Sequence, residues 1–109
     1  MTEEQKNALR RKIAAELTRL ADDILRLEEI TKPINTEDMD DVTRMDSIVN
    51  KSVNEAALTA SRSRRAALEY AAKRIDSPEF GYCADCGEEI PIARLSAMPE
   101  ATLCVGCAH

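Results

Sequence analysis

The chain is short, acidic and poor in aromatic residues. It has 109 residues, a formal net charge of −5, and an aromatic complement of two Tyr and one Phe. A chain of this size buries a small share of its surface, so its core is marginal without a metal, disulfides or a partner. The negative charge argues against a general DNA-binding protein, because affinity for phosphates comes from clustered Lys and Arg.

The N-terminal segment is charged and lacks the apolar stretch of a secretory signal. No apolar run approaches the roughly 20 residues that a membrane-spanning helix needs. We therefore expect a cytoplasmic location and no membrane contact. In that reducing compartment, paired cysteines are expected to bind a metal rather than to form disulfides.

Residues 1–76 are predicted to be helical, because they contain no glycine and a single proline, Pro33. In the first part, apolar residues recur every three or four positions, which is the spacing of a coiled-coil face. These residues are Leu9, Ile13, Leu17, Leu20, Ile24, Leu27 and Ile30. Pro33 is expected to end this helix shortly after Thr31.

A second helix is predicted to begin near residues 36–40, which are rich in N-cap residue types, and to continue to about Asp76. Its predicted packing face is small and alanine-rich: Val42, Met45, Val49, Val53, Ala56, Ala60, Ala67, Ala71 and Ile75. A small face against a large one lets two helices approach closely. Two helices joined by a short loop fold back as an antiparallel hairpin. We expect a monomer, with dimerisation through the alanine-rich face as the alternative.

The last third of the chain contains two paired cysteines, Cys83 with Cys86 and Cys104 with Cys107. This CxxC…CxxC spacing is typical of a structural zinc site with all four positions filled. A redox CxxC needs a βαβ context that is not predicted here, and a catalytic zinc needs an open position. His109 is interpreted as incidental. The sequence thus predicts one structural Zn²⁺, a module that loses its structure without it, and a left-handed turn at Gly87.

Together these elements predict a mainly α fold. Residues 1–76 form a long antiparallel two-helix coiled-coil hairpin with its tip at about residues 32–46. Residues 77–109 form a small C-terminal four-cysteine zinc finger.

The cysteine module resembles the DksA/TraR C4-type zinc-finger family of bacteria. The resemblance rests on the run from Phe80 to Leu95, with both cysteines of the first pair, and on Pro99 through Cys107. It implies a protein that binds RNA polymerase: the finger docks at the rim of the secondary channel and the hairpin inserts through it. The acidic tip then approaches the catalytic centre, often together with (p)ppGpp, and changes the lifetime of promoter complexes.

The tip departs from the motif that the resemblance implies. The DksA branch carries Asp-x-x-Asp-x-Ala, which counts back onto Asp40 through Met45. Asp40 matches, whereas Thr43 and Met45 replace the second Asp and the Ala, and Asp41 or Asp46 are the candidate substitutes. Two basic positions used for (p)ppGpp are Met98 and Ala67 here, which argues against (p)ppGpp binding.

The leading hypothesis is a transcriptional regulator that binds RNA polymerase without contacting DNA directly. The alternative is a zinc-stabilised interaction or stress module that kept the scaffold and lost the tip activity. A nucleic-acid-binding zinc ribbon would use the basic residues of the second helix, Arg62, Arg64, Arg65, Lys73 and Arg74. An enzyme is not expected, because no catalytic set of residues is apparent.

Overall fold

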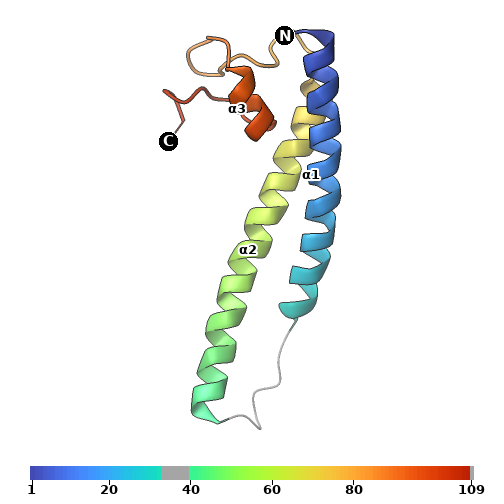
Figure 1. Cartoon of the computed structure of the whole chain (residues 1–109). Helices are drawn as coiled ribbons and strands as arrows, with labels where there is room; N and C mark the ends of the chain where they lie inside the picture. Colours follow the sequence, from blue (N-terminus) through green and yellow to red (C-terminus); the bar gives the residue numbers. More distant parts are fainter. Residues whose placement is uncertain (33–39, 109) are drawn as a thin grey trace.

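The computed structural model describes residues 1–32 and 40–108, and shows a rod with a small head at one end (Figure 1). Its principal extents are 60 × 27 × 18 Å. The described residues form three helices in chain order: α1 (Glu3–Ile30), α2 (Asp41–Arg74) and α3 (Ile92–Ala97). The predicted mainly helical hairpin with a C-terminal cysteine module is therefore confirmed. Most of the predicted tip loop, residues 33–39, lies outside the described residues, as does His109.

Helix α1 is 28 residues long and begins at a capping box. The Thr2 hydroxyl accepts from the Gln5 amide at 3.1 Å, and the Gln5 side chain accepts from the Thr2 amide at 2.9 Å. This reciprocal pair satisfies two amides that the first helical turn leaves without partners. The helix ends at Ile30, with Thr31 as its C-cap.

Helix α2 is 34 residues long and starts one residue after its cap, Asp40. The Asp40 carboxylate accepts from the Thr43 amide at 2.7 Å. Lys73 and Arg74 lie in the last turn, where positive charge complements the helix dipole. Over the described residues, no helix is both long and apolar enough to cross a membrane.

The core lies where the two long helices meet the head. Its buried members are Leu9, Ile13, Leu20, Leu68, Ala71, Ile75, Phe80, Cys83, Ile90 and Leu95. The first three come from α1, the next two from α2, and the last four from the cysteine module, with Ile75 as the C-cap of α2. One core thus joins the hairpin to the module, because neither part has enough apolar side chains to bury alone.

The predicted packing face of α1 is largely confirmed, but that of α2 is wrong over its tip half. Ala71 and Ile75 are buried as expected, yet Val42, Met45 and the rest of the stripe as far as Ala60 are exposed. From Arg44 to Leu68, the positions that are buried or half-buried are Arg44, Ser47, Lys51, Asn54, Leu58, Ser61, Arg64, Arg65, Ala67 and Leu68; of these only Ala67 belongs to the predicted face. The physical reason is that the large side chains Leu58 and Leu68 gain more from burial than alanines do, and they fix the rotation of the helix.

Candidate metal centre

The first cysteine pair lies on a tight knuckle after α2. The Cys83 amide donates to the Glu88 carbonyl at 2.8 Å, and the Gly87 amide donates to the Cys83 carbonyl at 3.0 Å. An isolated antiparallel bridge joins Tyr82 to Glu89. Gly87 has a φ of +74°, a left-handed conformation that glycine adopts without steric cost. The left-handed turn predicted at Gly87 is therefore confirmed.

The second pair lies on a similar knuckle near the end of the chain. The amides of Cys107 and Ala108 both donate to the Cys104 carbonyl, at 3.1 and 2.9 Å. The Ala84 amide donates to the Thr102 carbonyl at 2.8 Å, which ties the two knuckles together. From α3, the Arg94 Nε donates to the Leu103 carbonyl at 2.9 Å and holds the chain just before Cys104.

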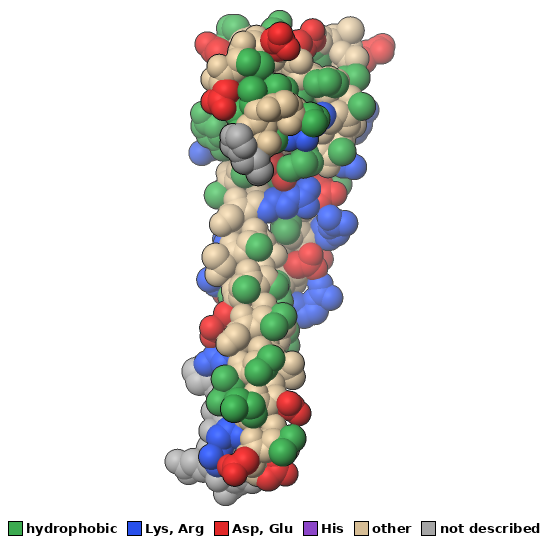
Figure 2. Space-filling model, turned by 90° about the vertical axis from the view of Figure 1, so that its left-hand side faces the viewer, with side chains coloured by type: hydrophobic (Ala, Val, Ile, Leu, Met, Phe, Trp, Pro, Cys, Tyr) green, Lys and Arg blue, Asp and Glu red, His purple; other side chains and the backbone are tan. Residues whose placement is uncertain are grey.

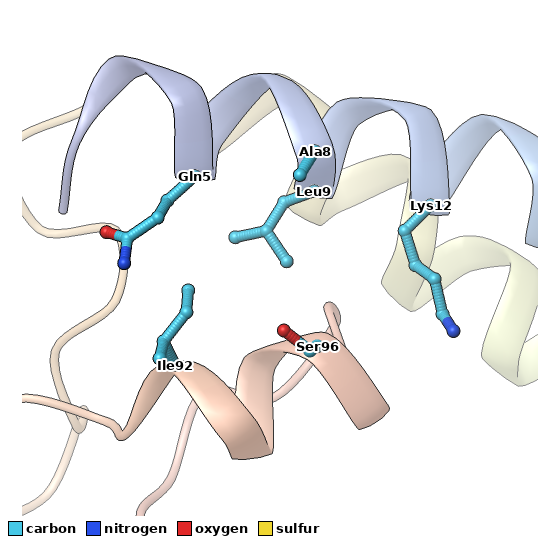
Figure 3. Close-up of a pocket in the computed structure, with 6 residues that line it drawn as sticks. All are labelled: Gln5, Ala8, Leu9, Lys12, Ile92 and Ser96. Atoms are coloured by element: carbon cyan, nitrogen blue, oxygen red, sulfur yellow. The ribbon is translucent and has the colours of Figure 1, made fainter.

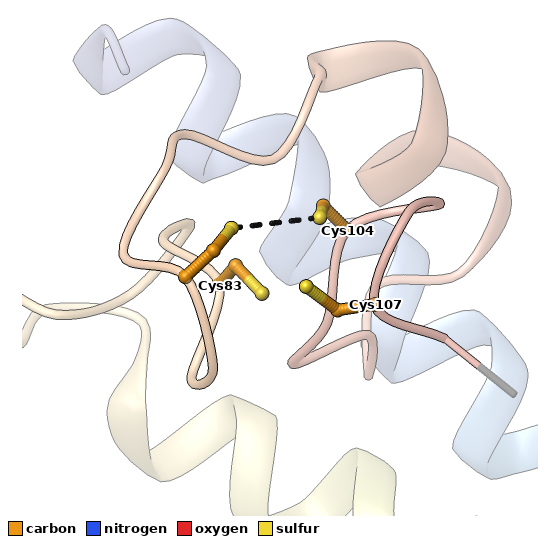
Figure 4. Close-up of side chains that lie close together, drawn as sticks. Cys83, Cys104 and Cys107 are labelled. Atoms are coloured by element: carbon orange, nitrogen blue, oxygen red, sulfur yellow. Dashed lines mark hydrogen bonds between the residues drawn. The ribbon is translucent and has the colours of Figure 1, made fainter.

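The four cysteine sulfurs converge on one point. All four lie within 4.8 Å of one another, and the Sγ atoms of Cys86 and Cys104 are 3.7 Å apart. Figure 4 shows the sulfurs of Cys83, Cys104 and Cys107 directed toward a common centre. A tetrahedral zinc with Zn–S bonds of ~2.3 Å separates its sulfurs by about 3.8 Å. The cluster therefore fits one zinc ion with four cysteine ligands.

The electrostatics of the cluster also call for a cation. Backbone hydrogen bonds from Cys86 and then Cys104 lower the pKa of the Cys83 thiol to about 6. Hydrogen bonds with the side chains of Cys104, Cys83 and Cys86 raise the pKa of the Cys107 thiol to about 12. Four thiolates this close repel one another unless a metal neutralises them. With four sulfurs bound, no position would remain for a substrate, so the metal would act as a structural clamp.

An ionic network fixes the cysteine module on the hairpin. The Arg64 Nε on α2 donates to Glu100 at 2.8 Å, and its Nη1 donates to Glu16 on α1 at 3.1 Å. The hydrogen bond to Glu100 is the largest cause of a raised pKa for Arg64. Sequence reasoning missed this network, because its members are 36 and 48 residues apart and no short-range pattern connects them.

A shallow pocket opens at the junction of α1 and α3 (Figure 3). Its volume is about 280 Å³, and it is lined by Gln5, Ala8, Leu9, Lys12, Ile92 and Ser96. Gln5 already belongs to the capping box. The lining combines the side chains of Gln5, Lys12 and Ser96 with three apolar ones and contains no acid–base pair, so it does not define a catalytic site.

The five predicted tip residues lie at the end of the rod opposite the cysteines (Figure 1). Asp40 caps α2 by binding the amide of Thr43, so the structure brings these two together. Asp41, Met45 and Asp46 are exposed on the first turns of α2. The described tip residues do not converge on a metal-binding or catalytic cluster.

The fold and the site together define a class of protein: a two-helix hairpin that carries a four-cysteine zinc finger. Residues 78–109 match the model of the prokaryotic dksA/traR C4-type zinc finger. The finger of this chain belongs to that family, as the resemblance implied.

Similar proteins extend the likeness beyond the finger. Over 40 residues the chain is 52% identical to the RNA polymerase-binding transcription factor DksA of Haemophilus influenzae, covering 37% of this chain and 28% of that protein. An uncharacterized protein of Aquifex aeolicus is 32% identical over 82 residues, covering 75% of this chain and 53% of the relative. The structure of transcription factor DksA2 from Pseudomonas aeruginosa matches with a TM-score of 0.69 at 22% identity. That match covers 97% of this chain and 81% of DksA2, and it shows a shared fold.

Proposed function

We propose that this protein binds RNA polymerase at the secondary channel and modulates transcription initiation. One observation carries the proposal: the zinc finger and the acidic tip residues Asp40, Asp41 and Asp46 lie at opposite ends of a rod about 60 Å long. This arrangement lets the finger dock at a surface while the far end reaches into a channel. The other two extents, 27 and 18 Å, include the head, so the hairpin that would enter is slender.

The chemistry of the tip supports an electrostatic role. Asp40, Asp41 and Asp46 cluster at the start of α2, and Figure 2 shows acidic side chains at this end of the rod. Carboxylates near a catalytic Mg²⁺ perturb the local charge even without becoming its ligands. The protein would thus alter an equilibrium of the polymerase, and it needs no catalytic group of its own.

The relatives support the partner. The H. influenzae relative is named an RNA polymerase-binding transcription factor, and its similarity to this chain lies within a 40-residue segment, a little over a quarter of its length. We extend the partner to this chain because the finger is shared and the fold of DksA2 covers nearly the whole chain. Polymerase binding implies the cytoplasmic location expected from the sequence.

The test is to co-purify the zinc-loaded chain with RNA polymerase and to measure promoter-complex lifetimes. Binding and a changed lifetime are expected. Asp41→Asn and Asp46→Asn should reduce the effect on lifetime while leaving binding nearly unchanged, because the finger makes the docking contacts. A matched control is Asp22→Asn, an exposed carboxylate on α1 away from the tip. Failure to bind, or to compete with another secondary-channel factor, would refute the proposal.

A second candidate function is an interaction module that lacks the tip activity. It is favoured by a specific observation: the carboxylate that matches the family motif, Asp40, is already engaged as the cap of α2. Thr43 and Met45 occupy the other two motif positions. A variant carrying Thr43→Asp and Met45→Ala separates the two functions. A promoter effect in this variant but not in the natural chain would favour the second candidate.

Direct nucleic-acid binding is disfavoured by the partners of the basic residues on α2. Arg64 is held by Glu16 and Glu100, and Arg62 lies 3.4 Å from Glu28. The Arg74 guanidinium lies over the Tyr70 ring, 5.1 Å from its centroid. To bind phosphates, these arginines would have to give up their contacts within the chain, which reduces the net free energy gained on binding nucleic acid.

A further inference from the structure

The first 14 residues of α2, residues 41–54, are weak helix formers. Arg44, Met45 and Lys51 are the only residues of strongly helix-forming types in this segment, and the others are Val, Ile, Thr, Ser, Asn and Asp. Branched side chains lose rotamer freedom in a helix, and Ser, Asn and Asp compete for backbone hydrogen bonds. By contrast, 13 of the 17 residues from 58 to 74 are Ala, Leu, Glu, Lys or Arg. The sequence of α2 therefore favours a helix strongly near the head and weakly near the tip.

Tertiary packing does not compensate for this weakness at the tip. No residue of segment 41–54 is buried, and the first buried side chain of α2 is Leu58, which is 7% exposed. Figure 1 shows that α2 continues past the end of α1 toward the tip. Since most helical stability in proteins comes from the packing of an apolar face, the tip segment lacks the main source of it.

Local contacts compensate only in part. Two exposed ion pairs lie along the segment, Asp41 with Arg44 and Lys51 with Glu55, each at 3.8 Å. Exposed pairs of this kind stabilise a helix slightly, and Lys before Glu is the less favourable order. The strongest local contact is the cap at Asp40, which fixes the first turn alone.

We propose that residues 41–54 form a unit that unfolds and refolds while the remainder of the hairpin stays folded. The helix melts from its cap at Asp40 back to about Glu55, where strong helix formers begin and Leu58 anchors α2. A local opening of this kind requires much less free energy than global unfolding. The carboxylates of Asp40, Asp41 and Asp46 therefore hold a fixed position relative to the finger only while the unit is helical.

This unit gives the tip a conformational switch that is set by helix propensity. On the proposed function, the tip acts in its ordered form, and binding then includes the entropy cost of ordering residues 41–54. A tip that is already more helical bears less of this cost and should act more strongly. This consequence rests on the proposed function, whereas the independent unfolding of the unit does not.

The test is amide hydrogen exchange, measured by NMR on the zinc-loaded full chain. Protection of the amides in residues 46–54 should be at least about a hundredfold lower than that in residues 64–74. Low concentrations of urea should change exchange at the tip little, because local opening exposes little surface, and should accelerate exchange near the head steeply. Equal protection of the two segments, or an equal dependence on urea, would overturn the proposal.

Paired variants test the cause. Asn50→Ala with Ser52→Ala should raise protection at the tip severalfold, up to about tenfold, from helix propensity alone, because both side chains are exposed. Asn50→Gly with Ser52→Gly should lower it. Ser63→Ala is the matched control, since Ser63 is exposed on the head half of α2, and it should leave exchange at the tip unchanged. Protection that fails to rise from the glycine pair through the natural chain to the alanine pair would overturn the propensity argument.

The same variants, assayed for promoter-complex lifetime, separate this inference from the proposed function. The effect on lifetime should be largest for the alanine pair and smallest for the glycine pair. If no variant binds polymerase, the proposed function is refuted while the exchange result still decides the independent unfolding. Equal lifetimes in variants whose tip exchange differs would overturn the link between tip helicity and activity.

Discussion

At the scale of single residues, Asp40 has two candidate roles that can be separated. Its carboxylate caps α2, and the Thr43 amide that donates to it lowers the pKa of this carboxyl. The same carboxylate matches the first position of the family's tip motif. A cap needs an acceptor oxygen, whereas an electrostatic role needs a negative charge. Substitutions that keep one property and remove the other therefore distinguish the two roles.

We expect Asp40→Ala to fray the first turn of α2 and Asp40→Asn to preserve it, because Asn is also a good N-cap. Since the folded-state pKa of Asp40 is lowered, its contribution is complete above the unfolded value of about 4 and is lost as pH falls through the folded pKa. Amide exchange of Thr43 measures this: protection should fall on acidification in the natural chain but not in Asp40→Asn. Equal protection in Asp40→Ala and the natural chain would contradict the capping role.

A second prediction at this scale concerns the two glycines of the knuckles. Gly87→Ala should weaken zinc binding by several-fold, because a Cβ at a φ of +74° costs about 1–2 kcal/mol. Gly106→Ala is the matched control: Gly106 does not have a positive φ, and its added Cβ would meet Cys104 Sγ at an ordinary 4.0 Å. Competition with a chromophoric chelator measures both affinities. Equal losses would show that backbone conformation does not decide the effect.

At the scale of elements, α2 differs along its length in what each face contacts. Near the head, Leu68 and Ala71 are buried in the shared core. Toward the tip, the side chains facing α1 are mostly polar, and Val53 on another face is exposed. The stability of the hairpin should therefore come mainly from its head end.

We expect Leu68→Ala to lower the free energy of unfolding by about 2–5 kcal/mol, because Leu68 is completely buried and the change leaves a cavity. Val53→Ala, which also removes methyl groups but at an exposed position, should change the free energy of unfolding by less than about 0.5 kcal/mol. Urea denaturation of both variants at low micromolar concentration makes the comparison. A large loss for Val53→Ala would contradict the exposed position of this side chain.

At the scale of the whole molecule, the zinc finger and the hairpin stabilise each other. Phe80, Ile90 and Leu95 share a core with both long helices, and Arg64 links α2 to α1 and to Glu100 of the finger. Loss of the metal should therefore destabilise the head ends of α1 and α2 as well as the finger. It should not reach the tip, which lies at the other end of the rod (Figure 1).

Removal of zinc with a chelator should lower the melting temperature and expose the core residues at the head. Most helical signal should remain, because α3 contributes six residues whereas α1 and α2 contribute 28 and 34. Amide exchange should rise in residues 80–107 and at the head ends of α1 and α2, and added zinc should reverse it. Acidification should favour the same loss, since protons compete with zinc for the thiols. Unchanged exchange in the finger after verified zinc removal would refute the clamp.

The sequence by itself determined the helical hairpin, the packing face of α1 and the four cysteines that converge on the candidate metal centre, because periodicity, proline and CxxC spacing act over short distances. It could not determine the rotation of α2. The predicted alanine-rich face and the face that contains Leu58 and Leu68 both repeat at helical spacing. Only packing against α1 decides which of the two faces is buried. Nor could it pair Arg64 with Glu16 and Glu100, since ionic contacts between distant segments follow from tertiary structure. The tip combines both kinds of feature. Its negative charges can be read from the sequence, whereas their orientation depends on where α2 begins, which is set by Asp40 as the N-cap.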